Sequence, residues 1–384
     1  MRFEFATAGR ILFGEGVLAE VAPAAAQMGS RALLVTGASR ERAAPLGRAL
    51  ETAGLVVLPL AIAGEPAVEQ IRTASEFARD ERCDLVVAMG GGSAIDAGKA
   101  IAALLTNPGE PLDYLEVIGR GQPLAHRSAP LIAVPTTAGT GSEVTRNAVL
   151  VSPEARVKAS LRSPGMLPVL AAVDPELTLD LPPALTAATG LDALSQLIEP
   201  YVSRRANAMT DMFCGEGLRH AATALPQAWE NGRDRAARTS MCWASLLGGL
   251  ALANAGLGAV HGFAAPIGGM FPAPHGAVCA ALLPHVIEIN VEALQSRAPA
   301  SDALRRYDAV ARLLTGRAQA TAGDAVWWIL ELTHRLGIPP LREYGVRESD
   351  WTALSAAAAR ASSMKGNPIE LTEEERMEIL ARAS

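Results

Sequence analysis

Five short apolar runs in the first half of the chain constrain its fold most strongly. They carry almost no polar residues, and the first three are separated by segments that suit helices. A strand without polar alternation is buried on both faces, which is typical of a parallel sheet covered by helices. The predicted strands are residues 31–36, 55–60, 84–89, 131–134 and 170–173. Before this sheet, residues 3–5 and 11–13 are expected to form a small hairpin.

The second half of the chain differs in character after about residue 175. The turn-rich sequence at 181–183 precedes long segments rich in Ala and Leu with little strand pattern. A chain of 384 residues is long for one core. We therefore expect an α/β domain over residues 1–180 and a helical domain over residues 181–384. The helices predicted there are residues 186–202, 206–225, 233–255 and 301–314.

Composition narrows the possible partners and the compartment. The net charge is −6 and there is no basic run, so nucleic acid is not expected as a partner. No stretch of eighteen apolar residues free of charge, Gly and Pro indicates a membrane span, and the N-terminus does not resemble a secretory signal. The four scattered cysteines predict reduced, buried thiols in a cytoplasmic protein.

The strongest local motif is a glycine run between a predicted strand and a predicted helix. Glycines there let backbone amides approach a pyrophosphate, and the helix N-terminus adds positive partial charge. Ser93 is predicted to cap the helix and to contact phosphate, and Asp96 and Lys99 follow near one helix face. A tight turn alone would also explain the glycines. The predicted cofactor-binding residues of this motif are Gly90, Gly91, Gly92, Ser93 and Asp96.

A second loop, over residues 135–143, follows another predicted buried strand. Its hydroxyls and glycines suit the phosphates and ribose of a dinucleotide at the end of a sheet. The alternative is a Ser/Thr-rich turn that caps the next helix. The predicted cofactor-binding residues here are Thr136, Thr137, Thr140 and Ser142.

Three residues in the helical half are candidates for a metal site. Asp192 lies early in an apolar helix, four residues before Gln196, and so shares a helix face with it. His261 and His275 are each followed by glycine in apolar surroundings. A single buried histidine is usually a core residue, whereas a pair makes a metal site more credible. A carboxylate at a helix N-terminus, favoured by the helix dipole, is the alternative for Asp192.

The ordered set of motifs resembles the iron-containing (group III) alcohol dehydrogenases. The set is GGGSxxDxxK, PTTAGTGSE, TGLDAL and VHG…PHG, and the resemblance runs over essentially the whole chain. It implies a Rossmann-like N-terminal domain with a parallel sheet, an all-helical C-terminal domain, an NAD(P) cofactor and a homodimer. Lys158 matches a lysine that the family places near the cofactor.

The resemblance also implies a metal site, from which this chain departs. The family uses one Asp and three His, and Asp192, His261 and His275 match three of these ligands. Gln196 stands where the third His is usual, and Ala265 stands where a further active-site His is common. Glutamine is a poor ligand for a borderline-soft divalent ion. Iron and zinc are therefore equally expected, and a site without metal stays open.

The loop after the first predicted strand indicates whether the cofactor carries a 2′-phosphate, as NADP does. Relatives that prefer NAD often have an acidic residue there, whereas residues 36–40 have none. Gly37 and Ser39 are predicted to contact the cofactor, and Arg40 with Ser39 suits a 2′-phosphate. The sequence thus favours NADP over NAD as the cofactor.

The predicted activity is hydride transfer between a nicotinamide and a small alcohol, aldehyde or ketone. Asp192, His261 and His275 are the predicted catalytic residues, because a metal on them would polarise the substrate oxygen. One alternative is a metal-independent reductase resembling the maleylacetate reductases. A lyase resembling 3-dehydroquinate synthase and a non-catalytic cofactor-binding protein are the others.

Overall fold

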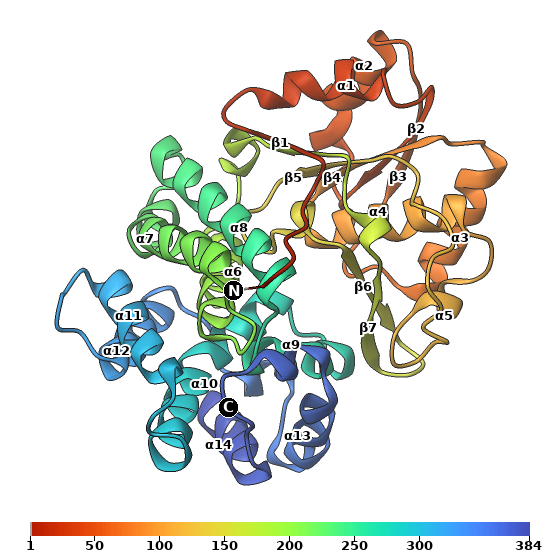
Figure 1. Ribbon diagram of the computed structural model, residues 1–384. Helices are drawn as coiled ribbons and strands as arrows, with labels where there is room; N and C mark the ends of the chain where they lie inside the picture. The colour runs from red at the N-terminus through yellow and green to blue at the C-terminus, as the bar shows by residue number, and fades with distance from the viewer. Residues whose placement is uncertain (1) are drawn as a thin grey trace. The chain divides into compact units, whose positions relative to one another are not determined.

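The computed structural model describes residues 2–384, which divide into two compact units (Figure 1). The sheet unit comprises residues 6–137 and 141–178. The helical unit comprises residues 2–5, 138–140 and 179–384.

Within residues 2–384, the sheet unit contains one six-stranded sheet in which every pair of neighbouring strands is parallel. Its strands are β1 (Arg10–Phe13), β2 (Arg31–Thr36), β3 (Val56–Ala61), β4 (Leu85–Gly90), β5 (Leu131–Pro135) and β8 (Leu170–Val173). Their order across the sheet is β1-β8-β5-β4-β2-β3. The predicted fold class, a parallel sheet followed by a helical region, is confirmed.

Helices cover both faces of this sheet, as the unbroken apolar strands predict. The helices are α1 (Val21–Ala25), α2 (Ala44–Thr52), α3 (Val68–Asp80), α4 (Gly92–Thr106) and the short α5 (Pro111–Tyr114). Alternate residues of β2 enter two different cores: Leu33 packs in the core that contains residues of α3 and α4, and Leu34 in the core that contains residues of α1 and α2. Figure 1 shows α1 and α2 on one side of the strands and α3 on the other.

The strand order reverses at the carboxyl ends of β2 and β4, where open α/β sheets form a crevice. After β2 the chain adds β3 on one side, then returns to add β4 on the other. Ligands of open α/β sheets bind at such a reversal, outside the carboxyl ends of the strands. Gly37 directly follows β2, and Gly90 is the last residue of β4.

Two features near the sheet differ from the sequence prediction. The hairpin predicted over residues 3–5 and 11–13 is wrong: residues 3–5 form no strand, and β1 pairs in parallel with β8. Phe5 instead packs against Phe213 in the helical unit, with ring centroids 5.6 Å apart. An antiparallel hairpin that the sequence analysis did not predict, β6 (Asn147–Ser152) and β7 (Val157–Arg162), follows the second cofactor loop.

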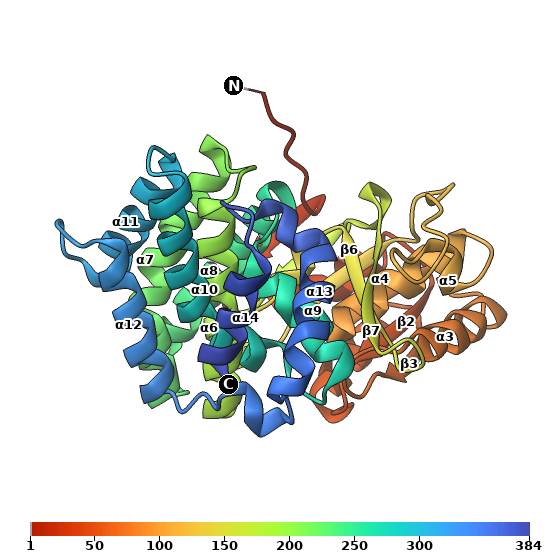
Figure 2. The same cartoon turned by 90° about the horizontal axis from the view of Figure 1, so that it is seen from below.

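The helical unit is built from helices that pack mainly around α6 and α10. They are α6 (Pro183–Val202), α7 (Ala208–Glu230), α8 (Arg235–Ala255), α9 (Ala259–Met270), α10 (His275–Arg297), α11 (Asp302–Thr315), α12 (Ala322–Arg335), α13 (Trp351–Arg360) and α14 (Glu373–Ala383). α10 contacts α6, α9, α12 and α14, and it lies among other helices of its unit in Figure 2.

The length and apolar composition of α10 also fit a membrane span. Among the described residues, α10 is the single helix that is long and apolar enough to cross a membrane. Together, α8 and α9 also satisfy this criterion, but as a pair bent by 97°. However, 72% of the apolar window of α10 is buried inside the structure, as in the core helix of a water-soluble protein.

Candidate functional site

The ends of three neighbouring strands bring the predicted cofactor glycines and threonines together. A Cβ built on Gly90 would lie 3.2 Å from the backbone nitrogen of Gly37 and 2.6 Å from Ala94 Cβ. Only glycine allows this approach of the β2 and β4 ends. A Cβ on Gly91 would lie 3.5 Å from Thr137 Cγ2, beyond the end of β5. Gly37, Gly90, Gly91 and Thr137 therefore line one backbone surface at the crevice of the sheet.

The N-terminus of α4 faces this crevice without a side-chain cap. Gly91 is the N-cap residue, and no side chain accepts a hydrogen bond from the first turn. The prediction that Ser93 caps the helix is wrong, because Gly92 begins the helix and Ser93 is its second residue. First-turn amides without an intrahelical partner bind anions such as phosphate.

Lys99 is fully buried and anchors the second cofactor loop to α4. Its Nζ donates to Ser142 Oγ at 2.7 Å, to Thr145 Oγ1 at 2.7 Å and to the carbonyl oxygen of Asn147 at 2.9 Å. An ammonium has three protons to donate, and all three have acceptors here. This lysine therefore positions the loop from inside the protein.

Asp96 completes the same buried network. Ser142 Oγ donates to its Oδ1 at 2.5 Å, and the backbone N–H of Val149 donates to its Oδ2 at 3.0 Å. Lys99 Nζ lies 3.5 Å from Oδ1. Burial raises the pKa of Asp96 and lowers the pKa of Lys99, while the charge of each residue partly offsets the shift of the other. Both carboxylate oxygens thus have partners within the sheet unit.

Glu143 is a further buried carboxyl in this loop that the sequence analysis did not assign. It lies in a short 3-10 helix, Ser142–Val144, directly after the loop, and is 2% exposed. Burial raises the pKa of Glu143 to about 7, against the lowering effect of its own backbone N–H and of Lys99.

The other predicted cofactor residues lie in different surroundings. Ser39 and Arg40 are exposed in the loop after β2. Thr136 donates its backbone N–H to the carbonyl oxygen of Gly90 at 2.9 Å. Thr140 belongs to the helical unit through the segment 138–140. Lys158 lies on β7, where its Nζ donates to Glu65 Oε1 at 2.9 Å.

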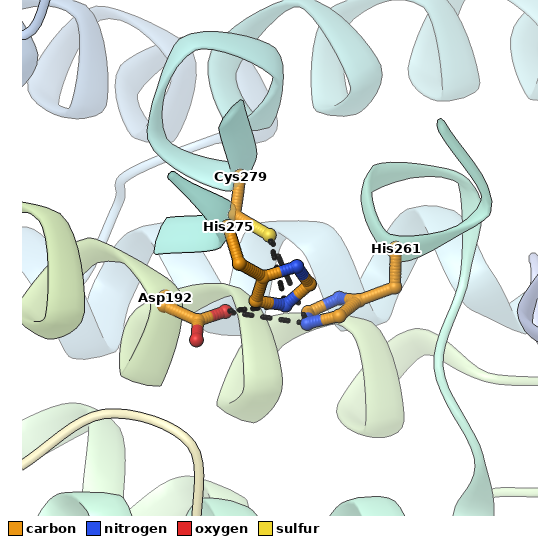
Figure 3. Close-up of side chains that lie close together, drawn as sticks. All are labelled: Asp192, His261, His275 and Cys279. Atoms are coloured by element: carbon orange, nitrogen blue, oxygen red, sulfur yellow. Dashed lines mark hydrogen bonds and ion pairs between the residues drawn. The ribbon is translucent and has the colours of Figure 1, made fainter. Parts of the chain in front are cut away.

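Three helices of the helical unit bring the predicted metal ligands together (Figure 3). Asp192 comes from the middle of α6, His261 from the start of α9, and His275 is the first residue of α10. Asp192 Oδ1 lies 3.3 Å from His261 Nε2 and 3.9 Å from His275 Nε2. The side chains of Asp192 and His261 are buried, and His275 is 32% exposed. One side of the cluster is therefore accessible.

The glycine after His275 is explained by close helix packing. A Cβ on Gly276 would lie 2.6 Å from the carbonyl oxygen of Ala188, in α6. A Cβ on Gly262 would lie 2.9 Å from Met364 Cε, the flexible end of a side chain that can move. Gly276 thus lets the start of α10, which carries His275, approach the backbone of α6.

Sequence reasoning missed Glu199, which orients His261. Its Oε2 lies 2.6 Å from His261 Nδ1, and its Oε1 accepts the backbone N–H of Val260 at 2.7 Å. A proton on Nδ1 that is donated to Glu199 leaves Nε2 to face Asp192. Glu199 lies seven residues after Asp192 on α6, so the helical spacing placed both on one face.

Sequence reasoning also missed the role of Cys279, the fourth member of the cluster. One ligand atom from each of Asp192, His261, His275 and Cys279 can be chosen so that all lie within 4.8 Å of one another. Cys279 is buried, and it follows His275 by one helical turn. That i, i+4 spacing was the available signal.

Charge shapes the pKa values of the cluster. Burial alone would raise the pKa of Asp192, but His275 and His261 outweigh it and lower this pKa. Burial would lower the pKa of His261, but Cys279, Glu199 and Asp192 hold it well above its ordinary value. Burial raises the pKa of Cys279 to about 12.

Two buried oxygens in this region have no hydrogen-bond partner among the described residues. They are Asp192 Oδ1 and Gln196 Oε1, from residues that are 1% and 3% exposed. A buried carboxylate oxygen without a donor is costly unless it binds a cation. Asp192 supplies a carboxylate, and His261 and His275 supply two imidazoles. This set of ligands fits a divalent metal ion.

Comparison with known protein families places the whole chain in one family. Residues 8–175 match the family model "Iron-containing alcohol dehydrogenase", and residues 186–384 match "Fe-containing alcohol dehydrogenase family, C-terminal". Alcohol dehydrogenase 4 of Saccharomyces cerevisiae is 36% identical over 377 residues, which cover 97% of this chain and 96% of the yeast protein.

Solved structures agree with this assignment. A 1,3-propanediol oxidoreductase is 33% identical, with a TM-score of 0.92 over 100% of both chains. A sulfoacetaldehyde reductase from Bifidobacterium kashiwanohense, in complex with NAD+, is 29% identical, with a TM-score of 0.85 over 100% of this chain and 99% of that one. The chain belongs to the iron-containing alcohol dehydrogenase family and is a nicotinamide-dependent oxidoreductase of alcohols and aldehydes.

Proposed function

We propose that this enzyme interconverts a small alcohol and its aldehyde or ketone with the help of a divalent metal held by Asp192, His261 and His275. The single observation that carries the metal is Asp192 Oδ1, a buried carboxylate oxygen that accepts no hydrogen bond from residues 2–384 and lies 3.3 and 3.9 Å from two imidazole nitrogens. A bound divalent ion supplies a Lewis acid for the substrate oxygen.

The residues of the cluster have different tasks in this proposal. Glu199 fixes the tautomer of His261, so that Nε2 is the nitrogen offered to the metal. Asp192 brings one negative charge, and the two imidazoles are neutral ligands. His275, the most exposed ligand, lies on the side from which a substrate enters. Gln196, which the resemblance put at the fourth ligand position, offers only an amide oxygen.

For the cofactor, we propose that the pyrophosphate is bound by the backbone of Gly91, Gly92 and Ser93. Two observations support this placement. The N-terminus of α4 has no side-chain cap, and Gly90 lies close to the backbone nitrogen of Gly37. The nicotinamide carries the hydride. Asp96 and Ser142 already share hydrogen bonds with each other, so we assign them to holding the loop in position.

We further propose that NADPH binds at least as well as NADH. Arg40 is exposed after β2 and forms no ion pair with a described residue, so its guanidinium is available to a 2′-phosphate. A relative whose structure contains NAD+ leaves this preference open for the family. The test compares both dissociation constants at one salt concentration. A preference for NADH of more than about tenfold, or about 1.4 kcal/mol, would contradict the proposal.

Other details stay predictions from the sequence. They are the assignment of residues 1–180 to the cofactor and 181–384 to metal and substrate, a homodimer, a cytoplasmic location, and the absence of nucleic-acid and membrane partners. A small diol or primary alcohol is the first substrate class to test, because the 1,3-propanediol oxidoreductase is similar over the whole chain.

The decisive test of function measures activity against metal content. Protein purified under mild conditions is assayed with small alcohols and aldehydes in both cofactors, then chelated, and then reloaded with zinc or ferrous ion. We expect chelation to abolish turnover and reloading to restore it, with cofactor affinity changed little. Full turnover in a verified metal-free sample would instead support the metal-independent reductase, with His261 and His275 donating hydrogen bonds to the substrate.

A further inference from the structure

The sulfur atom of Cys279 lies next to the predicted metal ligands. Its Sγ lies 3.7 Å from His275 Nε2 and 3.9 Å from His261 Nε2. Figure 3 shows the side chain pointing down from α10 toward both imidazoles, with Asp192 opposite. Cys279 is 0% exposed, so solvent does not compete for this position.

Four of the six separations between these four atoms lie within about 0.6 Å of those around one tetrahedral zinc ion. Bond lengths of about 2.0 Å to nitrogen or oxygen and about 2.3 Å to sulfur put neighbouring ligands about 3.3 Å (N to O) and about 3.5 Å (N to S) apart. The observed distances are 3.3 and 3.9 Å from Asp192 Oδ1 to the two nitrogens, and 3.7 and 3.9 Å from the sulfur to the same nitrogens. Shifts of a few tenths of an ångström would close the site around an ion.

A second, independent observation points to a cation in this space. Asp192 Oδ1 is buried, is directed at both imidazoles, and accepts no hydrogen bond from the described residues. The two nearest polar groups are His261 Nε2 at 3.3 Å and His275 Nε2 at 3.9 Å, which are longer than ordinary hydrogen bonds and leave space for an ion between the three side chains. A thiolate is a soft ligand that favours zinc, whereas the amide oxygen of Gln196 is a hard one.

We propose that Cys279 is a thiolate ligand that completes a four-ligand site with Asp192, His261 and His275, and that it makes zinc the preferred ion over iron. This inference rests on the proposed metal-assisted function. When the ion binds, the S–H bond of Cys279 breaks, its proton passes to solvent, and a sulfur–metal bond forms without any change of oxidation state. Zinc can expand to five ligands during catalysis, so four protein ligands are compatible with a Lewis acid.

The test uses cobalt(II) as a spectroscopic substitute for zinc in the full-length protein. Metal-free wild type, Cys279→Ser and Cys279→Ala are titrated with cobalt(II), with Cys83→Ser as the matched control from the sheet unit. Wild type and control should give visible d–d bands together with a near-ultraviolet sulfur-to-cobalt charge-transfer band. The two Cys279 variants should keep the d–d bands and lose the charge-transfer band. Their zinc affinity should fall by at least about tenfold, since losing even an outer partner of a ligand costs 10–100-fold.

The outcomes separate this inference from the function on which it rests. A d–d spectrum without a charge-transfer band in wild type, or the same band in the Cys279 variants, would overturn the thiolate ligand and leave the metal-assisted function intact. The absence of any cobalt spectrum in wild type would overturn both. A preference for ferrous ion over zinc in a competition measured on the metal-free wild type would overturn the zinc selectivity.

Discussion

The two buried polar clusters of this enzyme differ in whether they are complete by themselves. In the sheet unit, Lys99 donates three hydrogen bonds, and both oxygens of Asp96 have donors. In the helical unit, Asp192 Oδ1 and Gln196 Oε1 are more deeply buried than the Asp96 side chain, which is 15% exposed, but they accept no hydrogen bond from the described residues. The first cluster satisfies its polar groups internally, whereas the second leaves two buried oxygens without a hydrogen-bond donor among those residues.

This difference distinguishes a positioning network from a binding site. Buried polar groups are normally satisfied, so a satisfied cluster around a loop indicates that it holds the loop in place. A buried carboxylate that lacks a hydrogen bond beside two imidazoles and a thiol is typical of a metal-binding site, because all four side chains are metal-ligand types. Both clusters contain ionisable residues in family motifs, so residue type does not distinguish them. The presence or absence of hydrogen-bond partners does.

The largest expected effect comes from breaking the complete network. Lys99→Met leaves the largely buried Asp96, whose side chain is 15% exposed, beside no cation, so we expect a loss of about 3 kcal/mol in the free energy of unfolding. Lys365→Met makes the same change at an exposed residue and should stay within about 0.5 kcal/mol. Denaturant unfolding of both variants and wild type provides the measurement. A loss below about 1 kcal/mol for Lys99→Met would contradict the role of the network.

An effect of similar or smaller size is expected in the pH dependence of the free energy of unfolding, through the carboxyl group of Glu143. Its folded pKa of about 7 lies above the ordinary value of 4.5, so the folded state keeps a proton that the unfolded state loses. The contribution of Glu143 to stability is therefore complete below pH 4.5 and disappears as the pH rises toward 7.

We expect wild type to lose roughly 3 kcal/mol relative to Glu143→Gln between these pH values. Unfolding free energies of both proteins across the range test this. A constant difference between the two proteins would show that Glu143 is ionised in the fold throughout.

The smallest effect concerns the orientation of one ligand in the incomplete cluster. Glu199→Gln removes the charge that holds His261 Nδ1–H, and zinc affinity should fall by about 10–100-fold. Glu331→Gln removes an exposed charge from the same unit and should leave affinity unchanged. Competition with a chelating dye measures both. Equal zinc affinity in wild type and Glu199→Gln would mean that Glu199 does not position the ligand.

Local pattern predicted the parallel sheet well, because buried strands show as unbroken apolar runs. β2 and β8 begin and end at the predicted residues. The N-terminal hairpin failed because β1 pairs with β8, far along the chain, and no local pattern encodes that partner. α9 and α10 were not predicted because glycines and the internal prolines Pro266 and Pro284 resembled breaks.

The candidate site was only partly visible in the sequence. Asp192, His261 and His275 were grouped through the family resemblance, and the structure brings them together. Glu199 and Cys279 were missed, although each lies at helical spacing from a predicted ligand. Helical spacing shows which residues share a face, but only the packing of α6, α9 and α10 shows that these faces meet.

The central claim, that the cluster around Asp192 is completed by a metal ion, is tested most directly by equilibrium dialysis. Chelated protein is dialysed against zinc, and bound metal is counted per chain in wild type and in Asp192→Asn, which keeps the shape of the side chain but removes its charge. We predict one ion per chain in wild type and its loss in the variant. No bound zinc in folded wild type, or the same tight binding in Asp192→Asn, would contradict the account.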